Sequence, residues 1–247
     1  MNAYDSTFFD SIAKTANDSA DAVVPLVVQL LNPTSVVDFG CGEGVWLNAF
    51  RRHGVADVFG VDGDYVDRAK LLIPRETFVS ADLERPVTVG RNFDLAISLE
   101  VAEHLKPSAG EQFVRTLTEH SNTVLFSAAV PGQGGTRHIN EQWTPYWESL
   151  FEERGFRRID SIRPLIWNNK QVAWWYRQNM LLFASDAAIA KCQALADAYR
   201  AYGSTDMEFV HRRVIMKHGS FLSLCRRTAT AFTHAVRRRL RPSSQVE

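Results

Sequence analysis

The chain has 247 residues, of which 45% are hydrophobic, and it carries 28 basic and 28 acidic residues. This length indicates one sizeable core, as in a single α/β domain with appended segments. The three cysteines, odd in number and far apart, exclude a disulfide scaffold and a zinc ribbon and favour a reducing, cytoplasmic compartment. No signal peptide is recognisable, and the longest apolar stretch, 22–31, is too short to span a bilayer.

Apolar runs and turn residues predict the order of the elements along the chain. Residues 1–34 predict two helices that cap a sheet. Strands are expected near 35–39, 57–62, 76–80, 93–99, 122–128, 156–161 and 177–184. Helices are expected near 45–53, 64–71, 107–120 and 143–154. This alternation is typical of a doubly wound α/β sheet over residues 35–185, followed by a helical, basic extension over 186–247.

The first strand leads into a glycine turn. Residues 36–47 read VVDFGCGEGVWL, a short strand that ends at Asp38, a turn with Gly40, Gly42 and Gly44, and the start of a helix. Such a corner binds nucleotides in doubly wound sheets. The dinucleotide fingerprint would need a third glycine at position 45, where Val45 stands. An acid at the strand end suits a cofactor that carries an ammonium group and a sulfonium.

The D-x-G-x-G-x-G pattern resembles motif I of class I S-adenosylmethionine-dependent methyltransferases. The resemblance implies a seven-stranded Rossmann-like sheet and S-adenosylmethionine as the cofactor. It also implies that Asp62 accepts hydrogen bonds from the ribose and that Asp82 and Leu83 face the adenine. The expected cofactor residues are Asp38, Gly40, Cys41, Gly42, Asp62, Gly63, Asp82 and Leu83. The alternative is that the aspartates only cap the turns that follow their strands.

A second group of polar residues follows the fourth strand. Glu100, Glu103 and His104 stand at i, i+3 and i+4, so one helical turn would bring them to one face. The alternative is that the two glutamates favour a helix N-terminus. The loop after the fifth strand is rich in glycine and contains His138.

Together these residues resemble the small-RNA 3′-terminal 2′-O-methyltransferases, and ubiquinone-pathway O-methyltransferases share the Glu-x-x-Glu-His part. The resemblance implies one divalent ion bound by Glu100, Glu103, His104 and His138. Oxygen ligands with two imidazoles suit Mg²⁺ or Mn²⁺. Two open positions on an octahedral ion would accept two vicinal hydroxyls. Without a metal, His104 or His138 would serve as general base, so both are the expected catalytic residues.

The substrate is expected to meet the segment after His138. Its candidate contacts are Asn140, Glu141, Gln142, Trp143 and Tyr146, although the two aromatic residues would equally suit a helix core. Residues 127–156 resemble a bacterial methyltransferase family associated with cell-surface glycans, which implies O-methylation of a saccharide or glycolipid precursor. RNA ribose 2′-O-methylation, methylation of a phenolic quinone precursor, and a methyltransferase-like binding subunit stay open as alternatives.

The C-terminal tail differs in charge from the rest. Residues 205–247 hold nine Lys/Arg against three Asp/Glu, a net +6, which leaves −6 on the other residues. Residues 221–241 predict a basic amphipathic helix that lies on an anionic membrane surface or contacts nucleic acid, and the alternative is a solvated C-terminus. The acidic body argues against a long RNA groove, whereas a terminal nucleotide would still fit. The segment 163–176, which contains three tryptophans, is expected to be an insertion over the site.

Overall fold

The computed structural model describes residues 6–203, 210–211 and 213–214, and for residues 6–14 the backbone alone. The predicted basic helix at 221–241 therefore lies outside the described residues. Within the described part, no helix is both long and apolar enough to cross a bilayer.

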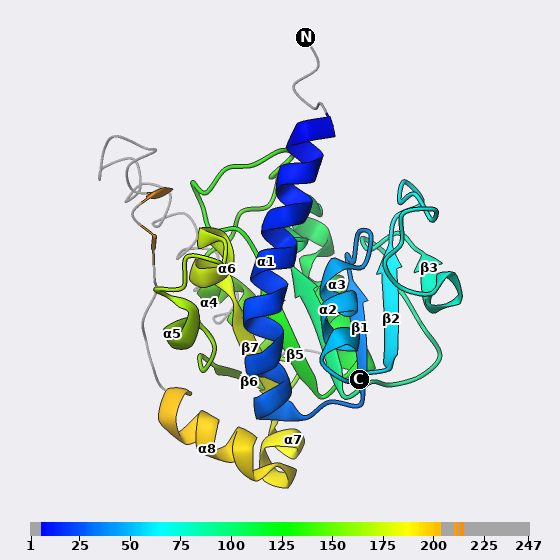
Figure 1. The fold of residues 1–247 in the computed structure, drawn as a ribbon. Coiled ribbons are helices and arrows are strands. Elements are labelled where there is room, and N and C mark those ends of the chain that lie inside the picture. The colour runs from blue at the N-terminus through cyan, green and yellow to red at the C-terminus, as the bar shows by residue number, and fades with distance from the viewer. Residues whose placement is uncertain (1–5, 204–209, 212, 215–247) are drawn as a thin grey trace, which may run out of the picture.

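Seven strands form one sheet in the order β3-β2-β1-β4-β5-β7-β6 (Figure 1). Their bounds are β1 (Ser35–Phe39), β2 (Asp57–Asp62), β3 (Phe78–Ser80), β4 (Leu95–Leu99), β5 (Thr123–Ser127), β6 (Phe156–Ile159) and β7 (Leu181–Ser185). Strands β1 to β5 pair in parallel, and β7 runs antiparallel between β5 and β6. The doubly wound, seven-stranded fold predicted from the sequence is confirmed.

Helices cover both faces of this sheet. They are α1 (Ser6–Leu31), α2 (Val45–Arg52), α3 (Gly110–His120), α4 (Thr144–Glu152), α5 (Arg163–Ile166), α6 (Trp174–Asn179), α7 (Asp186–Lys191) and α8 (Gln193–Tyr202). Three short 3₁₀ turns are η1 (Arg75–Thr77), η2 (Ala102–His104) and η3 (Pro107–Ala109). One core lies between the sheet and α1, α2 and α8, and the other between the sheet and α3 and α4.

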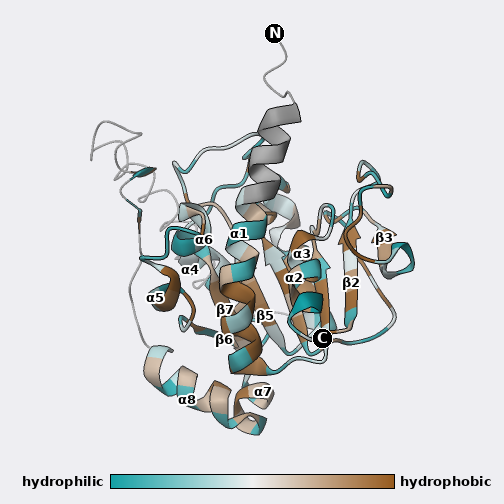
Figure 2. Ribbon diagram, viewed as in Figure 1, coloured by the Kyte–Doolittle hydropathy of each residue, from teal (hydrophilic) through white to brown (hydrophobic). Residues whose placement is uncertain are grey.

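The central strands are hydrophobic along their length, because both of their faces are covered (Figure 2). Val36 of β1 belongs to the first core and Val37 to the second, as the two-residue period of a strand requires. Parallel strands end at one edge of the sheet, so the turns after β1, β2, β4 and β5 meet there. That edge carries the candidate site.

Three expected elements were wrong. The N-terminal segment is one helix that runs through Pro25, because a single face with Val23, Val24 and Val27 stays buried against the first core on both sides of the proline. Residues 64–71 form turns, in which the Asp67 carboxylate accepts a hydrogen bond from the backbone N–H of Ala69 at 2.9 Å.

The strand expected at 177–184 begins later than predicted. Residues up to Asn179 belong to α6, and β7 begins at Leu181. Gln178 and Asn179 are buried polar residues whose side chains bond to Gln133 and Glu100 in loops at the sheet edge, so they do not continue the apolar strand. Expected C-terminal helical structure is present as α7 and α8, which cover 186–202.

Candidate functional site

The glycine turn after β1 brings the backbone close to β4. Gly40 has φ +95°, and a Cβ added there would lie 2.3 Å from Cγ2 of Val101. The Gly40 N–H donates to the carbonyl of Val61 at 2.7 Å, and Gly44, with φ +85°, begins α2. These positive φ values favour glycine, and at Gly40 no side chain fits.

Asp62, at the end of β2, is tied to this turn. One carboxylate oxygen accepts from the Gly42 N–H at 2.7 Å, and the other accepts from the Gly63 N–H at 2.6 Å. The Tyr65 hydroxyl donates to that second oxygen as well. Asp62 is 4% exposed, so most of its hydrogen-bonding capacity is directed at these three donors and the adjoining cavity.

A cavity of about 680 Å³ opens beside the turn, a size that suits a nucleoside-containing cofactor. Its lining residues are Gly40, Asp62, Gly63, Asp64, Tyr65, Ser80, Ala81, Asp82, Leu83, Glu84, Glu100, Val101, His104 and Leu105. Five of the eight expected cofactor residues are among them. Asp82 also accepts from the backbone N–H of Glu84 at 3.0 Å, so it both lines the cavity and holds the turn after β3.

The other three expected cofactor residues are not part of the cavity lining. Gly42 supports Asp62 through its N–H, and the Cys41 thiol faces Gly60, where an added Cβ would lie 2.7 Å from the sulfur. Asp38 is buried in β1, and burial, followed by the charge of Asp62, raises its pKa well above the ordinary value. Direct contact of these three with the cofactor stays a prediction.

Glu100 begins the second group. It has φ +58°, a left-handed conformation that is uncommon for glutamate, directly after β4. Its carboxylate accepts from Gln133 Nε2 at 2.8 Å and from Asn179 Nδ2 at 3.0 Å. Burial raises the pKa of Glu100, and these amide donors offset part of the effect. Sequence reasoning missed Gln133 and Asn179, since nothing near them in the chain points to Glu100.

Glu103, in the 3₁₀ turn η2, is completely buried, and within the described residues neither carboxylate oxygen meets a donor in hydrogen-bonding geometry. Burial, and then the charge of Glu100, raises the pKa of Glu103 well above its ordinary value. The backbone N–H groups of Glu103 and Ala129 lie near enough to oppose only part of this. A buried carboxylate without donors is costly, and a cation beside it would remove the cost.

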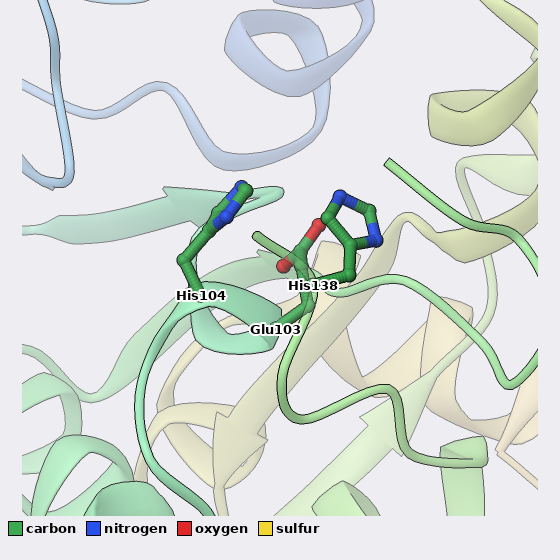
Figure 3. A group of neighbouring side chains, drawn as sticks. All are labelled: Glu103, His104 and His138. Carbon is green, nitrogen blue, oxygen red and sulfur yellow. The ribbon is translucent and has the colours of Figure 1, made fainter. Parts of the chain in front are cut away.

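Two imidazoles stand beside this carboxylate. Ligand atoms of Glu103, His104 and His138 all lie within 4.8 Å of one another, and Figure 3 shows the carboxylate between the two rings. The ring centroids of His104 and His138 are 4.9 Å apart, with the planes at 89°. Of the four expected metal ligands, the structure gathers these three. Glu100 is not among them: the amides of Gln133 and Asn179 bind its carboxylate, which still lies close enough to Glu103 to raise the pKa of Glu103. Its role as the fourth ligand stays a prediction.

The histidines differ in their surroundings. Burial, and then the neighbouring charge of His138, lowers the pKa of His104, although hydrogen bonding to the backbone of Arg137 and Thr136 opposes the shift. Nδ1 of His138 lies 3.1 Å from a carboxylate oxygen of Glu141, which leaves Nε2 for a ligand or a proton. His104 is therefore neutral at neutral pH and can accept a proton.

The expected substrate residues hold the loop between β5 and α4. Glu141 accepts from the backbone N–H groups of Gly132 and Gly134, at 2.7 and 2.6 Å, as well as from His138. Burial alone would raise the pKa of Glu141, but these donors keep it below the ordinary value. Asn140 donates to the carbonyl of Ala102 at 3.2 Å and accepts from Gln142 at 3.0 Å.

The two aromatic candidates lie at the start of α4. Trp143 precedes the helix and is 6% exposed, whereas Tyr146 packs edge-on against Trp147 with centroids 4.9 Å apart. Contact of any of the five candidates with an acceptor stays a prediction, and their present bonds shape the loop that carries His138.

The strand order, the glycine turn bonded to the acid of β2, and the cavity at the carboxyl ends of the parallel strands define the class I methyltransferase fold. A family model described as a methyltransferase domain matches residues 12–172, and the chain therefore belongs to this family. It is a methyltransferase whose methyl donor is S-adenosylmethionine.

Solved structures share this fold at low sequence identity. The methyltransferase domain of bacterial CtHen1 is 22% identical with a TM-score of 0.51, over 69% of this chain and 98% of that one. DesVI of Streptomyces venezuelae is 14% identical with a TM-score of 0.55, over 72% and 95%. Magnesium protoporphyrin IX methyltransferase of Synechocystis PCC 6803, with bound S-adenosylhomocysteine, is 18% identical with a TM-score of 0.52, over 70% and 84%. No curated protein matches the sequence.

Proposed function

We propose that the protein is an O-methyltransferase that holds a divalent cation, Mg²⁺ or Mn²⁺, between Glu103, His104 and His138 and methylates a hydroxyl beside it. The supporting observation is the buried Glu103 carboxylate, which lacks a hydrogen-bond donor among the described residues and lies between two imidazoles. One carboxylate and two imidazoles are a donor set that first-row divalent ions accept. The residues present therefore fit such an ion.

A bound cation would supply Lewis-acid chemistry, which lowers the pKa of a hydroxyl on it. The chain supplies the rest. His104 belongs both to the cofactor cavity and to the cluster, so the cofactor and the acceptor hydroxyl share one wall. His138 is oriented by Glu141, and the carbonyl of Glu103 accepts from the N–H groups of Ile139 and Asn140, at 2.9 and 3.0 Å, which keeps the loop over the carboxylate.

A second mechanism uses the same residues without a metal. The lowered pKa of His104 keeps its imidazole neutral, so His104 would take the proton of the acceptor hydroxyl while the methyl group transfers. The methyl carbon then bonds to oxygen, and the sulfur leaves as neutral S-adenosylhomocysteine. Both mechanisms transfer the methyl group to oxygen.

The acceptor class proposed here is a saccharide, in a cell-surface glycan or glycolipid precursor. Its support is the resemblance of residues 127–156 to glycan-associated methyltransferases, together with the match between vicinal sugar hydroxyls and a cation with open positions. A cytoplasmic location with contact between residues 221–241 and a membrane surface completes this proposal. RNA ribose and quinone-precursor phenols are the competing acceptors.

Manganese binding tests the metal directly. Chelator-treated protein with bound S-adenosylhomocysteine is titrated with Mn²⁺ and followed by electron paramagnetic resonance. We expect His138→Ala to weaken binding at least about tenfold. The control His53→Ala changes an exposed histidine at the end of α2 and should bind Mn²⁺ like the wild type. Absence of binding in the wild type would refute the metal and leave the histidine-base mechanism.

The acceptor is tested by methyl transfer from labelled S-adenosylmethionine to three probes, a lipid-linked saccharide, an RNA 3′ end and a catechol. We expect transfer to the saccharide, lost on adding a chelator. Transfer confined to RNA or to the catechol would overturn the saccharide proposal, and transfer that survives the chelator would overturn the metal.

A further inference from the structure

Tyr65 and the ribose of the cofactor compete for the same carboxylate. We propose that the hydroxyl of Tyr65 occupies a ribose position on Asp62 when the cofactor is absent and that S-adenosylmethionine must displace it to bind. The proposal depends on the cofactor alone and is independent of the metal and of the acceptor.

Asp62 has few hydrogen-bonding positions left for the ribose. A carboxylate has about four lone-pair sites. Three are engaged, by the N–H groups of Gly42 and Gly63 and by the Tyr65 hydroxyl. In Rossmann-type sites the acid at this strand end binds ribose hydroxyls. Two ribose hydroxyls need two sites, and only one is left, so one donor has to leave.

Of the three donors to Asp62, Tyr65 is the one that can leave. The two N–H groups belong to the backbone of the turns after β1 and β2 and cannot move without opening those turns. Tyr65 is different, because it is 79% exposed although its hydroxyl points at the buried Asp62. Its ring gains little from packing and can swing into solvent at small cost.

The Tyr65 ring lies within the cofactor cavity, against Gly63. An added Cβ at Gly63 would lie 2.2 Å from Cε1 of Tyr65, so the phenol lies directly against a residue without a side chain. Tyr65 also lines the cofactor cavity, together with Asp62 and Gly63. Burial, and then the hydrogen bond to Asp62, raises the pKa of the Tyr65 hydroxyl, so at neutral pH it remains the donor. The ring thus fills part of the cavity that the nucleoside enters.

The consequence is a lower affinity for every ligand that carries the ribose, product included. When S-adenosylhomocysteine leaves, the Tyr65 hydroxyl replaces a ribose hydroxyl as the donor to Asp62. This replacement favours product release.

The test compares three ligands on Tyr65→Phe and on the wild-type protein by calorimetry. Removing the competing hydroxyl should raise the affinity for S-adenosylhomocysteine and for adenosine about fivefold. This gain is modest because the lost hydrogen bond to a charged group is partly exposed. 2′,3′-Dideoxyadenosine, which has no ribose hydroxyls to place on Asp62, should gain much less. Tyr199→Phe, in α8 and outside the cavity lining, is the control and should leave all three affinities unchanged.

A second measurement observes the ring itself. In protein labelled with 3-fluorotyrosine, the fluorine resonance absent from Tyr65→Phe belongs to Tyr65. Adenosine should shift it, and 2′,3′-dideoxyadenosine should shift it less. Unchanged affinities in Tyr65→Phe would overturn the proposal. Weaker binding would overturn it as well, since Tyr65 would then be a contact that the cofactor keeps.

Discussion

At the scale of single residues, Gly40 is the position where the cofactor turn tolerates no side chain. An added Cβ would meet three atoms of the Val101 side chain at 2.3, 2.8 and 3.1 Å. Valine is stiff about χ1, so it cannot rotate away. Gly54 is a matched control, because it has a similar φ, +93° against +95°, with nothing within 4 Å of an added Cβ.

We therefore expect Gly54→Ala to lower the free energy of unfolding by only about 1 kcal/mol, which is the cost of a left-handed alanine. Gly40→Ala should lower the free energy of unfolding by about 2 kcal/mol more, because the added methyl overpacks against Val101. Urea unfolding without cofactor measures both. Adding Val101→Ala to Gly40→Ala should restore part of the difference. Equal losses for the two alanine variants would show that the contact with Val101 is relieved at no cost.

Residue roles were predictable where the signal is local. Gly40, Asp62 and Asp82 follow strands at motif spacing, and the cavity includes all three. Gln133 and Asn179 were not predictable, because their partner Glu100 is 33 and 79 positions away in the chain.

At the scale of elements, the segment between β6 and β7 is fastened by a buried ion pair. Arg163, at the start of α5, binds both carboxylate oxygens of Asp160, at 2.8 and 2.6 Å. It also donates to the carbonyl of Gln178 at 3.0 Å, which joins α5 to α6. The two side chains are 1% and 2% exposed. Arg163 therefore fastens α5 to the packed body, and the expectation that 163–176 forms an insertion over the site stays a prediction.

Arg163→Met should lower the free energy of unfolding by about 3–5 kcal/mol, since it leaves the Asp160 charge buried without its partner. The control Arg154→Met breaks an exposed pair with Glu119 at 3.5 Å and should cost below about 1 kcal/mol. Chemical denaturation measures both. Arg163→Met combined with Asp160→Leu should recover most of the loss. A small loss in Arg163→Met alone would mean that water reaches Asp160.

Elements were predictable where apolar periodicity is long. The strands from 35 to 127 and helices α2, α3 and α4 agree with expectation to within a few residues. Residues 64–71 could not be identified as turns from periodicity, since the outcome depends on the Asp67 carboxylate bonding to its own backbone. The start of β7 was misplaced because Gln178 and Asn179 owe their burial to partners on other loops.

At the scale of the whole molecule, the two edges of the sheet hold acids whose pKa values move in opposite directions. At the amino edge, burial would raise the pKa of Asp94, but donors from Thr34 and Ser35 lower it below the ordinary value. At the carboxyl edge, burial, then the charge of Asp62, raises the pKa of Asp38. Ionisation of Asp38 therefore opposes folding at the carboxyl edge, whereas ionised Asp94 supports folding at the amino edge.

The signs follow from linkage between protonation and folding. The folded-state pKa of Asp94 is lowered, so its contribution is present above the unfolded pKa of about 3.9 and is lost as pH falls through the folded value. The folded-state pKa of Asp38 is raised, so stability is complete below about pH 3.9 and is lost as pH rises through the folded value. At neutral pH, Asp94 therefore stabilises the fold, and ionisation of Asp38 opposes it.

Two isosteric amides separate these effects. Asp38→Asn should be more stable than the wild type near pH 7, because a neutral amide avoids the buried charge, and this gain should shrink towards pH 4. Asp94→Asn should be less stable near pH 7, and its deficit should shrink as the pH falls. Urea unfolding at several pH values, without cofactor, measures both, and calorimetry with S-adenosylhomocysteine should show weaker binding for Asp38→Asn alone. A loss of stability in Asp38→Asn at pH 7 would contradict this prediction. It would mean that hydrogen-bond donors stabilise the ionised Asp38 carboxylate, so that its ionisation does not oppose folding.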